Sequence, residues 1–218
     1  MPNTPPPNTT FVIFDMDGTL VDSELCASQA LCDVWPDLPM TAAQMNDEYR
    51  GMKLTAKIDV LSQRYGIEAP EGTEKRLRER EAVIGASMIS INPGVTTVLD
   101  GLETRGINFC VASNAPKAKT LRNVKGCGLS AYFDNRAVYS AHDLGAWKPD
   151  PTLFLHAAAC EGVPPEACLV VEDSEAGIKA GLAAGMRVVF YDAHIKGTQH
   201  TPTASVTLFE DVLRHCHS

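Results

Sequence analysis

Five short apolar segments, spread along the chain, constrain the fold of this sequence more than any other feature. Each segment is bounded by turn residues and lacks the polar–apolar alternation of a half-exposed strand. This pattern is typical of strands that are buried on both faces of a parallel sheet. The segments are Phe11–Phe14, Asn108–Ala112, Ala137–Tyr139, Cys168–Val171 and Arg187–Tyr191.

Apolar residues at helical spacing lie between most of these predicted strands. Strands that alternate with helices predict an α/β fold with a Rossmann-like, doubly wound parallel sheet. In the last predicted helix, Gly177, Gly181 and Gly185 recur every four residues, so we expect close packing on the sheet and a helix end at Gly185. The predicted helices are Val95–Thr104, Lys117–Val124, Pro151–Cys160 and Glu175–Ala184.

One segment, from about Glu24 to Met88, contains helical patterns but no convincing strand. It predicts a helical-bundle cap domain inserted after the first strand, where it would cover the ligand crevice of an open α/β sheet. The predicted domains are a disordered Pro-rich tail at 1–10, a core at 11–22 and 90–218, and a cap at 23–89. We expect hinges near Val21–Asp22 and Ser90–Pro93.

Composition and charge exclude several classes of partner. The net charge of −8 argues against nucleic acid or an anionic membrane as a partner. No apolar run approaches the roughly 20 residues that span a bilayer, and the N-terminus lacks the pattern of a secretory signal. Seven cysteines without a C-x-x-C pair indicate a reducing compartment. We therefore expect a cytoplasmic protein, either a monomer or a weak homodimer.

Polar side chains follow the predicted strands, and parallel strands deliver them to one edge of the sheet. Four carboxylates in one crevice require a cation, and hard oxygen ligands select Mg²⁺. Asp15 and Asp173 are the natural metal ligands, with Glu172 expected to act through water. The residues delivered to this edge are Asp15 and Asp17, Ser113 and Asn114, Lys148, and Glu172 and Asp173.

The chemistry that fits this set is phosphoryl transfer to a carboxylate. Asp15 would attack phosphorus, while Asp17 would protonate the leaving oxygen and later deprotonate the attacking water. Gly18 would allow a tight turn beside the phosphate. The expected donors to the phosphoryl oxygens are Lys148, the Ser113 hydroxyl, and main-chain N–H groups around Asp17 to Gly18 and at Asn114.

The stretches "DMDGTLVDS", "VASN", "KPDP" and "VEDSEAGIKAGLAAGM" resemble, in order and spacing, the four motifs of the haloacid dehalogenase superfamily. The resemblance is closest to its β-phosphoglucomutase-like phosphatase branch, which carries a helical cap. It implies that Asp15 is the nucleophile and Asp17 the acid/base. It also implies that Ser113 and Lys148 hold phosphate, and that Asp173 and the Asp17 main-chain carbonyl ligate Mg²⁺.

The superfamily includes other reactions, and single positions separate them. Its phosphosugar mutases carry a histidine twelve residues after the nucleophile, where this chain has Ala27, which favours a phosphatase and keeps a mutase as the alternative. Asp17 argues against a dehalogenase and a phosphonate hydrolase, although Lys53 keeps the latter as a remote option. A catalytically silent binding module is equally remote, because Asp15, Asp17, Lys148 and Asp173 are all intact.

Substrate selectivity is expected to reside in the cap, where "YRGMKLTAK" contains Arg50 and Lys53. If these cations face the site, they favour a second anionic or hydroxylated group; the alternative is a solvated turn. The predicted function is thus Mg²⁺-dependent hydrolysis of a small phosphorylated metabolite. A sugar phosphate or phosphorylated sugar acid fits, and the resemblance suggests 6-phosphogluconate as one candidate.

Overall fold

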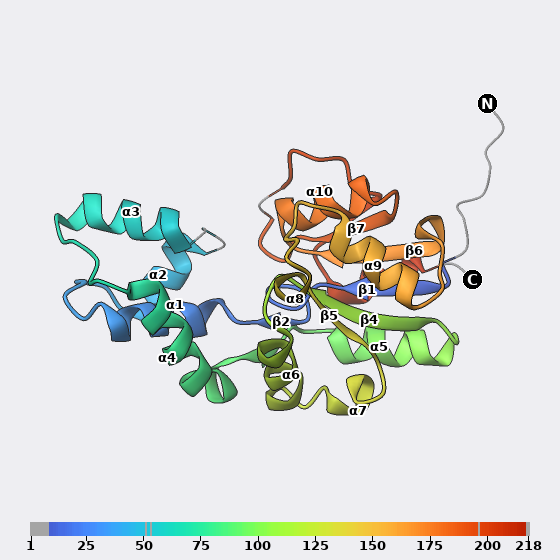
Figure 1. The fold of residues 1–218 in the computed structure, drawn as a ribbon, viewed down its shortest axis with the longest axis horizontal. Helices are drawn as coiled ribbons and strands as arrows, with labels where there is room; N and C mark the ends of the chain where they lie inside the picture. Colours follow the sequence, from blue (N-terminus) through green and yellow to red (C-terminus); the bar gives the residue numbers. More distant parts are fainter. Residues whose placement is uncertain (1–8, 51, 53, 196, 217–218) are drawn as a thin grey trace. The chain divides into compact units, whose positions relative to one another are not determined.

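The computed structural model describes residues 9–50, 52, 54–195 and 197–216 (Figure 1). The chain forms two compact units. The first combines the residues up to Val21 with those from Ile91 onward, and the second is Asp22–Ser90. The assignment of these units as a catalytic core and a cap stays a prediction.

The first unit contains a six-stranded sheet in which all neighbouring strands are parallel, in the order β5-β4-β1-β6-β7-β8. This sheet confirms the predicted α/β fold class. Strand β8 was missed because the segment around it is rich in threonine and has no apolar run. The strands are β1 Phe11–Phe14, β4 Asn108–Ser113, β5 Val138–Ser140, β6 Cys168–Glu172, β7 Arg187–Tyr191 and β8 Ala204–Val206.

Strand β1 lies at the centre, between β4 and β6. The chain adds β4 and β5 on one side of β1 and then crosses to add β6, β7 and β8 on the other. Such a change of direction is a topological switch point, and ligands of open α/β sheets bind beside it at the carboxyl ends of the strands. The topology therefore predicts a ligand site among the residues that follow β1, β4 and β6.

Helices cover both faces of this sheet, with α9 and α10 on one face and α5 on the other (Figure 1). The four helices predicted for this unit are present, and a 3₁₀ segment, η2, follows β8. The helical elements are α5 Val95–Thr104, α6 Lys117–Gly126, α7 Ser130–Phe133, α8 Ala141–Leu144, α9 Thr152–Cys160, α10 Glu175–Ala183, η1 Pro165–Ala167 and η2 Phe209–His215.

The central strand shows why the apolar runs do not alternate. Ile13 packs into the core formed with Phe154 of α9 and Ile178 of α10. On the opposite face, Phe14 stacks on Phe209 of η2 and meets Phe109 edge-on, with ring centroids 6.1 Å apart in both cases. Because both faces are covered, every position of β1 is apolar and buried.

The second unit consists of helices, as predicted, around an apolar core that includes the fully buried Trp35. Its α2 begins with a capping box between Thr41 and Gln44. The chain enters and leaves this unit through β2 Val21–Asp22 and β3 Ser90–Ile91, which pair with each other. The helices are α1 Glu24–Val34, α2 Ala42–Tyr49, α3 Leu54–Tyr65 and α4 Thr73–Met88.

Among the described residues, no helix has both the length and the apolar character needed to cross a bilayer.

We predict that Gly181→Ala destabilises the protein by about 1–3 kcal/mol, because overpacking a core has costs of this size. A Cβ at Gly181 would lie 2.7 Å from Val188 Cγ2 and 3.4 Å from Val170 Cβ, so α10 would have to move off the sheet. Chemical denaturation measures the free energy of unfolding. The control is Gly85→Ala in α4, whose new Cβ would meet only the end of the Ile89 side chain at 3.3 Å. Equal stability of the two variants would contradict the close approach of α10.

Candidate active site

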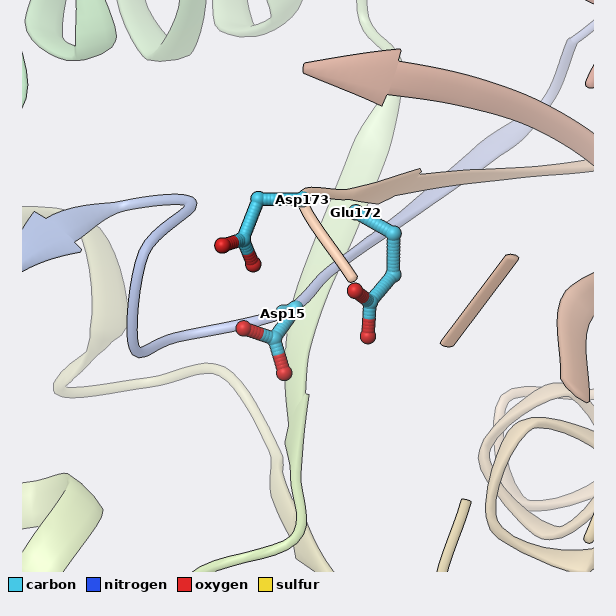
Figure 2. Close-up of side chains that lie close together, drawn as sticks. All are labelled: Asp15, Glu172 and Asp173. Atoms are coloured by element: carbon cyan, nitrogen blue, oxygen red, sulfur yellow. The ribbon is translucent and has the colours of Figure 1, made fainter. Parts of the chain in front are cut away.

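Two neighbouring strands, β1 and β6, bring three acidic residues together at the carboxyl edge of the sheet (Figure 2). The register pairs Phe14 with Val171, so that Asp15 follows β1 next to Glu172, the last residue of β6. Asp15 donates its main-chain N–H to the Val171 carbonyl oxygen at 3.0 Å. One oxygen from each of Asp15, Glu172 and Asp173 lies within 4.8 Å of the others. Strand register therefore creates this acidic cluster.

The ammonium group of Lys148 is bonded to two members of the acidic cluster. Its Nζ lies 2.5 Å from Asp15 Oδ1 and 2.6 Å from Glu172 Oε1, and it donates to the Ala112 carbonyl oxygen at 2.9 Å. All three of its protons thus have acceptors, which is what a side chain only 2% exposed requires. The Lys148 main-chain N–H donates to Asn114 Oδ1 at 3.0 Å, which fixes the segment between α8 and α9.

Glu172 is completely buried, and both of its carboxylate oxygens are engaged. Oε1 contacts Lys148, while Oε2 accepts hydrogen bonds from the Ser174 N–H at 3.0 Å and the Ser174 hydroxyl at 2.9 Å. A Cβ at Gly177 would lie 1.8 Å from Glu172 Cδ, so only glycine fits there. Gly177 therefore makes room for Glu172, a reason that its helical spacing did not reveal. The role of Glu172 as a water-mediated metal ligand stays a prediction.

The turn that follows Asp17 brings the main chain against Asp173. Gly18 has a φ of +94°, and a Cβ there would lie 2.2 Å from Asp173 Oδ2. The Thr19 hydroxyl donates to Asp173 Oδ1 at 3.2 Å. The expected tight turn is present, and the structure supplies a second reason for glycine: only glycine leaves space for the Asp173 carboxylate.

Ser113 and Asn114 lie at the end of β4, the neighbour of β1 on its other side. The Ser113 hydroxyl accepts a hydrogen bond from the Ala115 N–H at 3.1 Å. Within the part of the chain that the structure describes, the main-chain N–H groups of Asp17 and Asn114 donate to no other protein group. Main-chain N–H groups at such turns are ready donors for a bound anion.

Asp17 differs from Asp15 in its surroundings. It is not part of the three-carboxylate cluster, and its side chain is 29% exposed. Its Oδ1 accepts a hydrogen bond from Asn123 Nδ2 at 3.5 Å, and its Oδ2 lies 3.9 Å from Lys119 Nζ; both partners belong to α6. The two aspartates of the first motif are thus held by different partners.

Sequence reasoning missed Asn92, which supports the loop that carries Asp17. The Asn92 side chain is buried and donates to the carbonyl oxygens of Gly18 at 3.0 Å and Thr19 at 2.8 Å. Its main-chain N–H donates to the Leu20 carbonyl oxygen at 3.0 Å. An asparagine before Pro-Gly reads as an ordinary turn residue. No local signal in the sequence connects it with a loop more than seventy residues earlier.

The electrostatics of the cluster favour an additional cation. Burial raises the pKa of Asp15 well above its usual range; Lys148 opposes this shift, whereas Glu172 and Asp173 add to it. Burial disfavours the charged form of Lys148, but Asp15 and Glu172 outweigh it and raise the Lys148 pKa. Three carboxylates therefore face one ammonium group. A set of hard oxygen donors with excess negative charge suits a divalent metal ion.

Of the two cap cations singled out in the sequence, Arg50 lies among the described residues and Lys53 does not. The Arg50 guanidinium forms an ion pair with Asp22 at 2.7 Å and lies 3.4 Å from Asn46 Oδ1, both within the second unit. Asp22 also accepts a hydrogen bond from the Glu24 N–H at 3.1 Å, at the start of α1. Lys53 lies outside the described residues. A role for either cation in selectivity stays a prediction.

The fold and the cluster define a class of protein: an α/β enzyme with an acidic, lysine-containing site at the switch point of its sheet. Residues 10–185 match the family model for haloacid dehalogenase-like hydrolase, and the chain therefore belongs to that family. This membership confirms the predicted superfamily.

Known proteins similar to this chain agree with the family assignment. The 6-phosphogluconate phosphatase of Escherichia coli is 32% identical over 90% of this chain and 89% of its own length. Hexitol phosphatase B of the same species is 30% identical over 83% of this chain and 82% of its own length. Among solved structures, a haloacid dehalogenase-like protein of Agrobacterium tumefaciens has a TM-score of 0.79 at 27% identity, covering 95% of this chain and 97% of that one. The predicted enzyme class, a phosphoric monoester hydrolase, is confirmed by the family and these relatives.

We predict that Asp15→Asn stabilises the protein against unfolding at neutral pH when divalent cations are absent. Because the folded-state pKa of Asp15 is raised, its ionisation destabilises the folded protein, and the neutral amide avoids this. The advantage of the variant vanishes below the unfolded-state pKa, where Asp15 is protonated in both states. It grows as pH rises from the unfolded-state pKa to the folded-state pKa and stays constant above that.

Urea unfolding with a chelator present, at about pH 5 and about pH 7.5, measures this difference. Asp134→Asn, at an exposed position in the same unit, serves as the control. A parent protein that is more stable than Asp15→Asn at the higher pH would contradict the prediction.

Proposed function

We propose that this protein is a Mg²⁺-dependent phosphatase that hydrolyses a small phosphorylated sugar or sugar acid through an aspartyl-phosphate at Asp15. The observation that carries the proposal is the position of Lys148, whose ammonium group contacts both Asp15 and Glu172 at the switch point of the sheet. A buried lysine beside a strand-end aspartate provides positive charge where a transferring phosphoryl group needs it.

In the first step, a carboxylate oxygen of Asp15 attacks phosphorus, and the bond between phosphorus and the ester oxygen breaks. Asp17 gives its proton to the departing oxygen, so that the leaving group departs as an alcohol. Lys148, the Ser113 hydroxyl and the main-chain N–H groups at Asp17 and Asn114 stabilise the charge on the phosphoryl oxygens. The contacts described above support these separate roles, because Asp15 is bonded to Lys148 whereas Asp17 is bonded to Asn123.

In the second step, water attacks the phosphorus of the aspartyl-phosphate. Asp17, now ionised, accepts a proton from this water, and the bond between phosphorus and the Asp15 oxygen breaks to release inorganic phosphate. The partial exposure of Asp17 supports a role in exchanging protons, whereas the buried Asp15 suits a nucleophile. One residue thus serves as acid first and as base second.

The residues proposed to hold Mg²⁺ are Asp15 and Asp173, with Glu172 acting through water and the Asp17 carbonyl oxygen as a further ligand. Their fit to the ion rests on three carboxylates whose oxygens lie within 4.8 Å of one another and on the charge that Lys148 leaves uncompensated. When bound, Mg²⁺ would offset the negative charge of the carboxylates and the phosphoryl group.

The proposed substrate class rests on the relatives and on the second unit. Two relatives are named for 6-phosphogluconate and hexitol phosphates, and a third is named a phosphorylated carbohydrates phosphatase. Arg50 would provide a cation for a second polar or anionic group. Ala27, at the position where mutases of the family carry histidine, favours hydrolysis over transfer. The cytoplasmic location and the state of monomer or weak homodimer remain predictions.

We predict that the purified protein releases inorganic phosphate from p-nitrophenyl phosphate when Mg²⁺ is present and that a chelator abolishes this release. Asp15→Asn should be inactive, with a loss of at least about a thousandfold, because an amide cannot form the aspartyl-phosphate. Asp134→Asn, an exposed aspartate of the same unit, should retain parent activity. A parent protein without turnover, or an active Asp15→Asn variant, would contradict the proposal. Isomerised sugar phosphate in place of free phosphate would identify a mutase.

We predict that Arg50→Ala changes substrate selectivity, lowering kcat/KM for sugar-acid phosphates about tenfold relative to p-nitrophenyl phosphate. A panel of sugar phosphates, sugar-acid phosphates, phosphoglycolate and nucleotides measures the change. Asp22→Asn is the matched control, because it removes the ion pair at 2.7 Å but keeps the Arg50 charge. Selectivity that shifts equally in both variants would assign Arg50 to the structure of the second unit. The same panel with Lys53→Ala tests the other cation.

A further inference from the structure

Two side chains of α6 contact the carboxylate of Asp17, and neither follows from the sequence motifs. Asn123 Nδ2 donates to Asp17 Oδ1 at 3.5 Å, and Lys119 Nζ lies 3.9 Å from Asp17 Oδ2. Asn123 is buried, although asparagine in the middle of a helix usually faces solvent. Its position four residues after Lys119 places both side chains on one face of α6. That face is directed at Asp17.

Asp17 needs such support because, within the described part of the chain, its carboxylate is held from α6 alone. The neighbouring main chain is fixed, since Asn92 binds the carbonyl oxygens of Gly18 and Thr19. Asp15 is fixed by Lys148. The Asp17 carboxylate lies outside the acidic cluster and is partly exposed, and the described side chains that contact it are Asn123 and Lys119 of α6. A carboxylate without these contacts could rotate about its side-chain bonds.

We propose that Asn123 is a positioning residue that orients the Asp17 carboxylate for proton transfer to the leaving oxygen, with Lys119 assisting. This inference rests on the proposed phosphatase function and deepens it. In this role Asn123 acts through Asp17, the residue to which its side chain donates. Proton transfer requires the acid within hydrogen-bond reach of the departing oxygen, so an acid that samples several orientations is less effective.

Loss of a positioning residue slows esters with different leaving groups unequally, whereas loss of a purely structural residue slows them alike. In the first step the Asp15 oxygen–phosphorus bond forms, the phosphorus–ester oxygen bond breaks, and the proton moves from Asp17 to the departing oxygen. An alkoxide leaving group depends on that proton, whereas p-nitrophenolate departs without it. The ratio kcat/KM covers events up to formation of the aspartyl-phosphate, so it isolates this step. Loss of positioning must therefore slow an alkyl phosphate more than p-nitrophenyl phosphate.

The experiment compares the parent enzyme with Asn123→Leu, which keeps the approximate size of the side chain and removes the donor. The probes are p-nitrophenyl phosphate and the best alkyl ester from a panel of sugar phosphates, sugar-acid phosphates and glycerol phosphate. We expect Asn123→Leu to lower kcat/KM for the alkyl ester about tenfold more than for p-nitrophenyl phosphate. Lys119→Met, at a more exposed position, should change the ratio in the same direction by a smaller factor.

Thr120→Val is the matched control. Thr120 lies on the buried side of the same helix, and its hydroxyl has no hydrogen-bond partner among the described residues, so its removal should leave the ratio of the two kcat/KM values unchanged. Thermal unfolding confirms that each variant is folded. If Asn123→Leu does not fold, Lys119→Met decides the question, because a partly exposed position tolerates substitution better than a buried one.

Three results would overturn the inference, and they separate it from the proposed function. Equal losses for both esters in Asn123→Leu would make Asn123 a structural residue. An unchanged ratio in both α6 variants would show that Asp17 needs no support from this helix. In either case the phosphatase proposal stands. A parent protein that releases phosphate from no ester would overturn the proposed function together with this inference.

Discussion

The contact of the Lys148 ammonium group with Asp15 and Glu172 is the interaction on which the site depends. Strand register places two buried carboxylates side by side, and without a cation their repulsion would oppose the pairing of β1 with β6. Lys148 supplies part of the compensation from a segment that is anchored through Asn114. The remaining negative charge is what makes the cluster suitable for a divalent metal ion.

Small residues and main-chain contacts hold this charged centre in place. Gly18 lets the Asp173 carboxylate approach the turn, and Gly177 lets Glu172 reach Lys148. Asn92 holds the same turn from the point where the chain re-enters the first unit. Each of these residues serves a partner that is distant in sequence or belongs to another element, and replacing either glycine would displace a carboxylate rather than only strain the backbone.

Sequence patterns predicted much of the fold because both-face burial leaves a clear signal. The runs at Phe11–Phe14 and Arg187–Tyr191 are strands with the predicted bounds, and Val95–Thr104 is a helix as predicted. Strand β8 was not predicted because it is a short edge strand without an apolar run. The residues predicted for the site came from the strand-end rule and the family motifs, whereas Asn92 and Asn123 carry no motif. Both are asparagines whose partners lie in other elements.

The sequence by itself determined the fold class, the family and the set of residues at the carboxyl edge, because apolar periodicity and motif spacing are local properties. Only the tertiary structure decided which contacts each of those residues makes. Glu172 is bonded to Lys148, and Asp17 faces α6 while Asp15 lies in the acidic cluster. These contacts join elements far apart in the chain, and their distances follow from sheet register and helix packing, which no local pattern encodes.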